Sequence, residues 1–259
     1  MTWKLWIPLV ALALLVADLP SASARSAYKK RKVGYSVKLG GNTFRIWGGA
    51  KTGIMPKGCS VSPNGKYLYV TNFGRRRRHN LNVIDALTLK PIKTLHWKGN
   101  SIESLSSLDS KTLYVTDWYK SRLHFVDTAT WKITKSVRPG NKPKWMTLSP
   151  KGKHLYVANW GGKVAKLDAK TGKRLARLKT GRYPRGISVT PDGKTLYVAN
   201  VGGKAVSVVD AATMKVTKQI HTRAHPRHTA LTKDGKLLYV SILSDGTLAV
   251  IDTKLGKVM

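Results

Sequence analysis

The stretch Gly186-Ile187-Ser188-Val189-Thr190-Pro191-Asp192-Gly193-Lys194-Thr195-Leu196-Tyr197-Val198-Ala199-Asn200 holds two short apolar runs separated by a turn. Residues alternate in character by two within each run, which is typical of a β-strand. The segment 191–194 has Pro and Gly where a tight turn needs them. Two more apolar runs follow, so we predict four antiparallel strands, termed a to d in chain order, at 186–190, 195–199, 205–209 and 215–220.

The same unit recurs along the chain. The tyrosine of strand b recurs at spacings of 45, 42, 41 and 42 residues, as Tyr69, Tyr114, Tyr156, Tyr197 and Tyr239. The aspartate that ends strand c recurs at spacings of 42, 41, 42 and 42 residues, as Asp85, Asp127, Asp168, Asp210 and Asp252. Four short antiparallel strands per repeat are typical of a propeller blade, whereas a helical repeat would show apolar spacings of three and four. The sequence therefore predicts an all-β chain, a β-propeller of four-stranded blades with five clear repeats.

The end of strand b carries a recognisable motif. Tyr69-Val70-Thr71-Asn72, Tyr156-Val157-Ala158-Asn159 and Tyr197-Val198-Ala199-Asn200 resemble the YVTN family of β-propeller repeats, including its periplasmic YncE-like members. The resemblance covers about residues 53–259 and implies a propeller that is six- or seven-bladed if complete. Residues 33–39 and 43–47 are predicted as strands c and d of a partial N-terminal blade. Because the last repeat stops short, we expect the 33–259 propeller to be truncated at its C-terminus; the alternative is a small ring that the N-terminal strands close.

The first 24 residues have the pattern of a signal peptide. Lys4 precedes an apolar run over 7–17, and Ala22-Ser23-Ala24 is a small-residue cleavage pattern. We therefore predict cleavage before Arg25, a periplasmic or secreted location and no transmembrane segment afterwards. The alternative is a single uncleaved N-terminal anchor. Residues 25–32 form a basic arm, interpreted as a solvated terminus.

Composition narrows the class of function. The chain has 259 residues, 47 Lys and Arg against 12 Asp and Glu, a net charge of +35, and 42% hydrophobic residues, enough for a packed core. So basic a surface attracts anions, and so few acids do not suit calcium cages or multi-carboxylate sites. Cys59 is the only cysteine, so no internal disulfide forms, and its place in an alternating strand predicts a buried, inert thiol.

The repeat accounts for most carboxylates. Nine acids fall in turns, where an Asp side chain accepts hydrogen bonds from its own turn: Asp85, Asp109, Asp127, Asp168, Asp192, Asp210, Asp234, Asp245 and Asp252. Apart from Asp18 in the signal peptide, only Glu103 and Asp117 remain. No haem, phosphate-loop or hydrolase-elbow motif is present, and His221, His225 and His228 are a partial metal-ligand set. We therefore predict no catalytic residues, no metal and no cofactor, and a protein that is not an enzyme.

Cations recur where the d–a loops open on one face of a propeller. Lys57, Lys144, Arg185 and Arg227 each follow a proline at equivalent repeat positions, and Ser101-Ile102-Glu103 is the exception. The b–c loops on that face add further cations and aromatics: Arg75, Arg76, Arg77, Arg78, Lys120, Arg122, Lys163 and Lys204, with Phe73, Trp118, Tyr119, Trp160, and the d–a residues Trp145 and Tyr183. Cations interleaved with aromatic rings suit a flexible anionic polymer.

These observations predict an exported binding or scaffold protein. Its expected partner is an anionic polymer, a single-stranded nucleic acid or an acidic polysaccharide, or an anionic cell surface. The lysines that recur on the opposite face favour the simpler alternative of general electrostatic adhesion or solubility. Two other classes stay open: a lactonase-like propeller enzyme that uses Glu103, Asp117 and the 221–228 histidines, and a surface-layer scaffold with protein partners.

Overall fold

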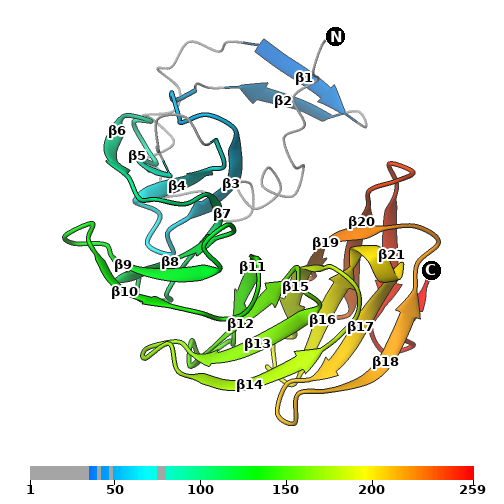
Figure 1. The fold of residues 1–259 in the computed structure, drawn as a ribbon. Helices are drawn as coiled ribbons and strands as arrows, with labels where there is room; N and C mark the ends of the chain where they lie inside the picture. Colours follow the sequence, from blue (N-terminus) through cyan, green and yellow to red (C-terminus); the bar gives the residue numbers. More distant parts are fainter. Residues whose placement is uncertain (1–34, 40–41, 47–48, 75–79) are drawn as a thin grey trace.

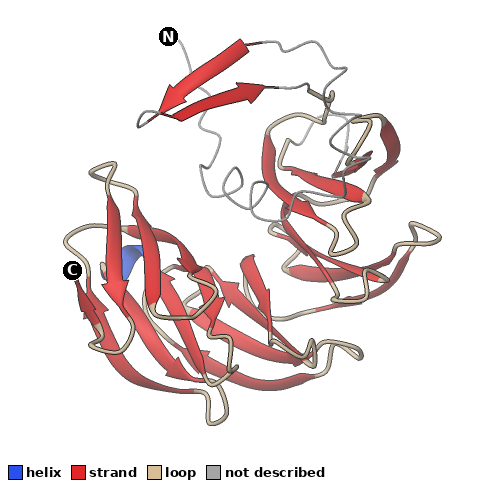
Figure 2. Cartoon of the chain, turned by 180° about the vertical axis from the view of Figure 1, so that it is seen from behind, coloured by secondary structure: helices blue, strands red, loops and turns tan. Residues whose placement is uncertain are grey.

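The structure is a computed structural model that describes residues 35–39, 42–46, 49–74 and 80–259. The predicted signal peptide, the basic arm and the run Arg75 to Arg78 lie outside the described residues. The regular secondary structure of the described residues is β-strand throughout, apart from one short 3-10 helix, η1 (Val201–Gly203) (Figure 2). Within the described ranges, no helix has the length and apolar character needed to cross a membrane.

Five four-stranded antiparallel sheets confirm the predicted blades. The first blade contains β3 (Pro56–Val61), β4 (Tyr67–Asn72), β5 (Leu81–Asp85) and β6 (Pro91–Leu95). The second contains β7 (Ser101–Ser106), β8 (Thr112–Asp117), β9 (Arg122–Asp127) and β10 (Ile133–Val137). The third contains β11 (Pro143–Leu148), β12 (His154–Asn159), β13 (Lys163–Asp168) and β14 (Arg174–Lys179). The fourth contains β15 (Pro184–Val189), β16 (Thr195–Asn200), β17 (Ala205–Asp210) and β18 (Lys215–His221). The fifth contains β19 (Pro226–Leu231), β20 (Leu237–Ile242), β21 (Leu248–Asp252) and β22 (Lys257–Val258).

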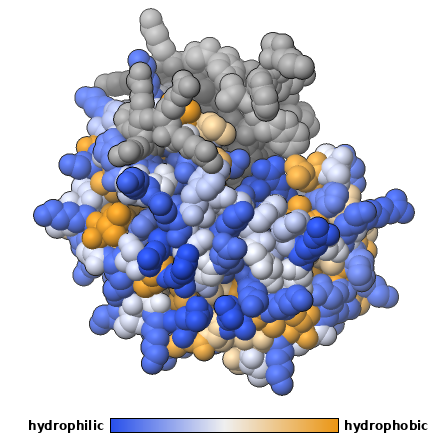
Figure 3. Space-filling model, viewed as in Figure 1, coloured by the Kyte–Doolittle hydropathy of each residue, from blue (hydrophilic) through white to orange (hydrophobic). Residues whose placement is uncertain are grey.

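The blades stand side by side around an axis (Figure 1). Their first strands are the inner strands, β3, β7, β11, β15 and β19, and the inner strands of neighbouring blades contact each other. The two strands predicted at 33–39 and 43–47 correspond to β1 (Tyr35–Leu39) and β2 (Asn42–Ile46), which pair antiparallel in a separate two-stranded sheet. The view of Figure 3 shows a mostly hydrophilic surface with small hydrophobic areas, as a charge-rich chain requires.

The recurring tyrosine joins each blade to the next. Tyr156 on β12 packs with Ile187 and Leu196 of the fourth blade, and Tyr69, Tyr114 and Tyr197 make the equivalent contacts from their own blades. Burial of each ring stabilises the fold by about 2–3 kcal/mol. Tyr239, on the fifth blade, is 36% exposed, whereas the other four tyrosines are at most 4% exposed. The strand-b tyrosine therefore packs against the core of the following blade rather than within its own blade.

The turn aspartates act as predicted. Asp127 Oδ1 accepts hydrogen bonds from the backbone N–H and the hydroxyl of Thr130, both at 2.7 Å. The same pair of bonds joins Asp168 to Thr171 and Asp210 to Thr213. These bonds stabilise the charged carboxylate and lower its pKa in all three turns. The carboxylates of these turns therefore stabilise local structure.

The prediction that Cys59 is buried is wrong. Cys59 lies on β3 at the position that Met146 and Ile187 occupy on β11 and β15. Those two side chains are covered by the preceding blade, whereas the thiol of Cys59 is exposed. Alternation along a strand predicts the face of the sheet on which a side chain lies. Whether that face is buried depends on the neighbouring blade.

Candidate functional site

A β-bulge begins every inner strand. The pairing of the inner strand with strand b shifts register after its first residue, as between Pro143 and Met146 or between Pro184 and Ile187. The same shift occurs in the other three blades. A bulge turns side chains away from their ordinary alternation. In four blades the residue in this bulge is a cation, and we call Lys57, Lys144, Arg185 and Arg227 the axial cations.

Threonines of strand b hold the bulges of two blades together. Thr71 Oγ1 accepts a hydrogen bond from the N–H of Gly58 at 2.9 Å and donates to the carbonyl of Ile102 on the next inner strand at 2.7 Å. Thr116 likewise accepts from the N–H of Glu103 and donates to the carbonyl of Lys144. In the first two blades the third residue of the repeated motif thus fixes the backbone next to Lys57 and at Lys144, whereas Ala158 and Ala199 occupy this position in the third and fourth blades.

The axial cations lie close enough to repel one another. Burial and the charges of Arg185, Lys57 and Arg227 lower the pKa of Lys144 to about 7. Burial and the charge of Arg227 lower the pKa of Arg185 to about 10, and burial followed by the two arginines lowers the pKa of Lys57. Within the described residues, none of the four forms an ion pair with a carboxylate. The structure thus brings the four predicted cations close enough to act on one another electrostatically.

Glu103 and His228 complete the cluster around the axis. Burial raises the pKa of Glu103 to about 8 against the opposing effect of Arg185 and Lys144, so the carboxyl is largely protonated at neutral pH. Burial and then Arg185 and the other axial cations lower the pKa of His228 to about 3, so its ring is neutral. Arg185 Nε donates to His228 Nε2 at 3.4 Å, and Arg227 Nε is buried without a hydrogen-bond partner. Neither neutral group offsets the positive charge.

Aromatic rings and cations alternate next to this cluster. Lys144 Nζ lies 4.2 Å from the ring centre of Trp118 and 4.9 Å from that of Trp160. Lys142 lies over Trp118, Tyr183 stacks on Trp160 at 4.7 Å, and Arg182 lies over Tyr183. We call this row the aromatic ladder: Lys142, Trp118, Lys144, Trp160, Tyr183 and Arg182. Trp118, Trp160 and Tyr183 are half-buried.

The remaining predicted aromatics differ in position. Trp145 on β11 is half-buried and its ring lies 4.7 Å from the ring of His228, so it packs between blades beside the axial cations. Phe73 stacks on Tyr119 at 5.7 Å, and Lys57 lies over Phe73. The b–c loop cations Lys120, Arg122 and Lys204 are exposed, and Lys163 is half-buried. The predicted aromatics thus border the axial cations rather than lying apart from them.

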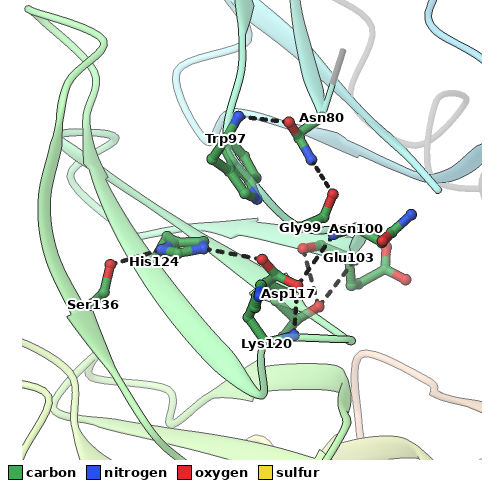
Figure 4. A network of polar contacts seen from close by, with 10 residues as sticks. Asn80, Trp97, Gly99, Asn100, Glu103, Asp117, Lys120, His124 and Ser136 are labelled. Atoms are coloured by element: carbon green, nitrogen blue, oxygen red, sulfur yellow. Dashed lines mark hydrogen bonds and ion pairs between the residues drawn. The ribbon is translucent and has the colours of Figure 1, made fainter. Parts of the chain in front are cut away.

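Asp117 belongs to a row of polar side chains across strands b, c and d of its blade (Figure 4). Its carboxylate accepts the N–H groups of Asn100 and Lys120, and its Oδ2 lies 3.6 Å from His124 Nε2. His124 Nδ1 in turn lies 2.7 Å from Ser136 Oγ. The first and fourth blades form the same row from Asn72, Asn82 and Thr94, and from Asn200, Ser207 and Gln219. The repeat therefore explains this Asp-His-Ser arrangement.

Sequence reasoning missed three members of the site. His228 was grouped with His221 and His225 as a partial metal set, but the described residues contain no cluster of three candidate metal ligands. His228 instead occupies the third position of its inner strand, as Glu103 does, and that shared register was the available signal. Lys142 and Arg182 were also overlooked, although each lies in a d–a loop beside a named aromatic.

Comparison with known families identifies the family of this propeller. The family model described as "Lactonase, 7-bladed beta-propeller" matches residues 109–211 and 176–258, which together span more than half of the chain. The chain belongs to this lactonase propeller family. Membership places the chain on a propeller scaffold, and such scaffolds carry many different activities.

Individual relatives of this lactonase-family propeller are more distant. Antigen Lp49 of Leptospira interrogans is 31% identical over 108 residues, which are 40% of this chain and 24% of that protein. Hydrazine synthase of Kuenenia stuttgartiensis matches with a TM-score of 0.70 and 26% identity, over 78% of this chain and 64% of the other. A protein of unknown function from Desulfotomaculum acetoxidans matches with a TM-score of 0.69 and 19% identity, over 79% and 70% of the two chains, and shows the fold alone. The chain spans about a quarter of Lp49 and under two thirds of the hydrazine synthase chain.

Replacing Glu103 with Gln in this lactonase-family propeller is expected to change how stability depends on pH. The pKa of Glu103 in the folded state, about 8, lies above its ordinary value of 4.5. Glu103 therefore makes its full contribution to the free energy of unfolding below pH 4.5, and this contribution is lost as pH rises toward 8. Because the lowered pKa values of His228 and Lys144 act with the opposite sign, the wild-type curve alone hides this effect.

The comparison of variant and wild type isolates the Glu103 contribution. Between acidic pH and the folded-state pKa, Glu103→Gln should lose about 4 kcal/mol less of its free energy of unfolding than wild type. Urea denaturation of both proteins across this range measures the difference. Parallel stability curves would show that Glu103 is ionised in the folded protein.

Proposed function

We propose that this propeller binds an anionic polymer across the face that carries the axial cations and the aromatic ladder. One observation carries the proposal: four cations converge at the axis, and no described carboxylate pairs with any of them. Mutual repulsion among buried cations costs free energy that an arriving anion would relieve. Arg185 and Arg227 suit phosphate or carboxylate oxygens, since guanidinium groups bind them in a bidentate manner.

The aromatic ladder supports a polymer rather than a simple ion. Its alternation of cations and rings matches a chain whose anionic groups alternate with rings that can stack. Trp118, Trp160 and Tyr183 are half-buried, so stacking on them costs little ordering of the protein. Single-stranded nucleic acid fits this alternation most closely, because each nucleotide offers one phosphate and one planar base.

Uneven placement of acids favours this face over the opposite one. Eight of the 11 described acids lie in a–b and c–d turns, on the opposite face: Asp85, Asp109, Asp127, Asp168, Asp192, Asp210, Asp234 and Asp252. There they offset the lysines of the a–b turns, Lys66, Lys111, Lys153, Lys194 and Lys236. On the proposed face, Asp117 is buried, Glu103 is largely protonated at neutral pH and Asp245 alone is an exposed acid. The cations of the proposed face therefore have almost no exposed acids beside them, whereas the lysines of the opposite face are interspersed with aspartates.

Salt dependence of binding tests the proposal. Fluorescence anisotropy of a labelled single-stranded oligonucleotide, measured over a range of salt concentrations, should show affinity falling steeply as salt rises, with a slope of about −0.7 per phosphate contacted. A labelled acidic polysaccharide serves as a second probe. Absence of binding to both polymers at low salt would refute a polyanion function.

Replacing Trp160 with Ala should weaken oligonucleotide binding about tenfold. Loss of one stacking platform costs about 1–3 kcal/mol per base, and Trp160 also supports Tyr183. Tyr239→Ala, which removes an exposed ring from the fifth blade, is the matched control and should leave affinity unchanged. Titrations of the two variants at one salt concentration provide the comparison. Equal weakening by both variants would contradict the assignment of stacking to the ladder.

Lactone hydrolysis is the second candidate function. Family membership favours it, and Glu103 and Lys144, with pKa values of about 8 and about 7, are both able to exchange protons near neutral pH. Glu103→Gln should then abolish turnover while leaving polymer binding intact. A screen of lactone substrates with and without added divalent metal distinguishes this enzyme from a binding protein.

The expected cellular setting completes the proposal. The signal-peptide pattern of residues 1–24 and the resemblance to YncE-like YVTN repeats favour a periplasmic or secreted protein. A scaffold with protein partners would instead show binding with little salt dependence. Fractionation of cells that express the full sequence tests the location directly.

A further inference from the structure

Lys144 is a lysine held in an unusual environment. It lies in the bulge at the start of β11, and its residue is only 8% exposed. The indole rings of Trp118 and Trp160 flank its amine, with ring centres 4.2 and 4.9 Å from Nζ. Among the described residues, no hydrogen bond links Nζ to a carbonyl or carboxylate, so no acceptor fixes it as an ammonium.

The charges around Lys144 favour an anion attached to its amine. Lys57, Arg185 and Arg227 all act on Lys144 electrostatically, and Glu103 is the one carboxyl that does. Because Glu103 is largely protonated at neutral pH, the surroundings contain three cations and almost no compensating charge. His228, from β19, adds a neutral ring and no further charge. A carboxylate formed on Nζ would therefore meet strong electrostatic stabilisation.

We propose that Lys144 is a site of reversible carboxylation by carbon dioxide. The lone pair of the neutral amine attacks the carbon of CO₂, a nitrogen–carbon bond forms, and one carbon–oxygen π bond opens onto oxygen. The nitrogen then releases one proton to water, which leaves a carbamate anion on Lys144. No oxidant, reductant or metal takes part, and loss of CO₂ after reprotonation reverses the reaction.

Three features of the site promote this reaction. Since burial and neighbouring cations lower the pKa of Lys144 to about 7, a large share of the amine is neutral at physiological pH, unlike that of an exposed lysine. CO₂ is small and apolar, so it suits an amine between two indole rings where larger carbonyl compounds would be hindered. Arg185 and Arg227 can then hold the new carboxylate with charge-assisted hydrogen bonds.

Carboxylation would link polymer binding to CO₂. The modification replaces a cation by an anion and places a carboxylate among the axial cations, where a polymer phosphate is proposed to bind. CO₂ should therefore weaken the proposed polymer binding. The modification itself does not rest on the proposed function, since it can be measured with no polymer present.

Carbon-13 spectroscopy tests the proposal directly. The full chain is equilibrated with ¹³C-bicarbonate at slightly alkaline pH, and a carbamate carbon signal is recorded for wild type, Lys144→Arg and Lys142→Arg. The first variant keeps the positive charge of Lys144 but loses the reactive amine, and the second alters the neighbouring ladder lysine as a matched control. We expect a carbamate signal in wild type and Lys142→Arg that is lost in Lys144→Arg, beyond the signal of the α-amino group common to all three.

Trapping on the wild-type protein removes any dependence on variant folding. An alkylating oxonium reagent converts a carbamate to a stable ester, and peptide mass analysis then locates it. We expect the trapped group on the peptide that contains Lys144, with an occupancy that rises with CO₂. A signal that persists in Lys144→Arg, or trapping spread evenly over exposed lysines, would overturn the proposal.

Discussion

The variant Lys57→Glu/Arg227→Glu is expected to bind single-stranded DNA about 100-fold more weakly than wild type, or not at all. These two axial cations are less buried than Lys144, so their reversal alters the site with the least risk to folding. Each substitution removes one phosphate contact. It also introduces, near Arg185, a carboxylate that repels the phosphates of the DNA. The slope of affinity against salt should fall by about 1.4, because each contact on a single strand contributes about 0.7.

A matched variant separates this effect from net charge. Lys153→Glu/Lys194→Glu changes the total charge by the same amount but lies in the a–b turns of the opposite face. We expect a loss of less than about threefold from it, because exposed charges beyond a Debye length, about 10 Å at moderate salt, are screened. Equal losses in both variants would assign binding to general electrostatic adhesion, the simpler alternative that the sequence left open.

Gly186→Ala is expected to reduce the free energy of unfolding by about 3 kcal/mol. Gly186 lies on β15 where β19 approaches it, and a Cβ there would lie 2.8 Å from His228 Cα and 2.9 Å from the carbonyl oxygen of Arg227. Both atoms belong to backbone, so the two inner strands have to separate. Separation also moves Arg185 away from Arg227, and polymer binding should weaken together with stability.

Urea denaturation measures the effect against Gly203→Ala. A Cβ on Gly203 would lie 3.4 Å from Asn200 Cβ, which is an ordinary contact, so we expect less than about 1 kcal/mol of destabilisation. If Gly186→Ala is as stable as this control, the two inner strands pack more loosely than the structure indicates.

Local patterns made the blades predictable from sequence. In the fourth repeat the predicted strands at 186–190, 195–199, 205–209 and 215–220 correspond to β15–β18 with shifts of at most two residues at any boundary. Period-two alternation, turns that contain Pro or Gly, and recurring aspartates are all local signals, and their repetition averages out the noise of any one copy. The position of the axial cations followed from the same register.

The missing parts of the site depend on contacts between blades. The bulge that directs Lys144 leaves no mark in the sequence, and neither does the approach of its amine to Trp118 of the preceding blade. The protonation of Glu103 depends on burial by strands that are distant in sequence. Cys59 shows the same limit, because its exposure depends on whether a neighbouring blade covers β3.

Because the strand-b tyrosines couple each blade to the one that follows it, cooperativity between blades has a direction along the chain. Each blade is coupled to its successor, so the stability of a blade includes a nearest-neighbour term that the following blade supplies. Loss of one tyrosine contact should therefore loosen the junction between two neighbouring blades, while the other junctions keep their own contacts. Each axial cation lies on the inner strand of a different blade, so the spacing of these cations depends on the same junctions.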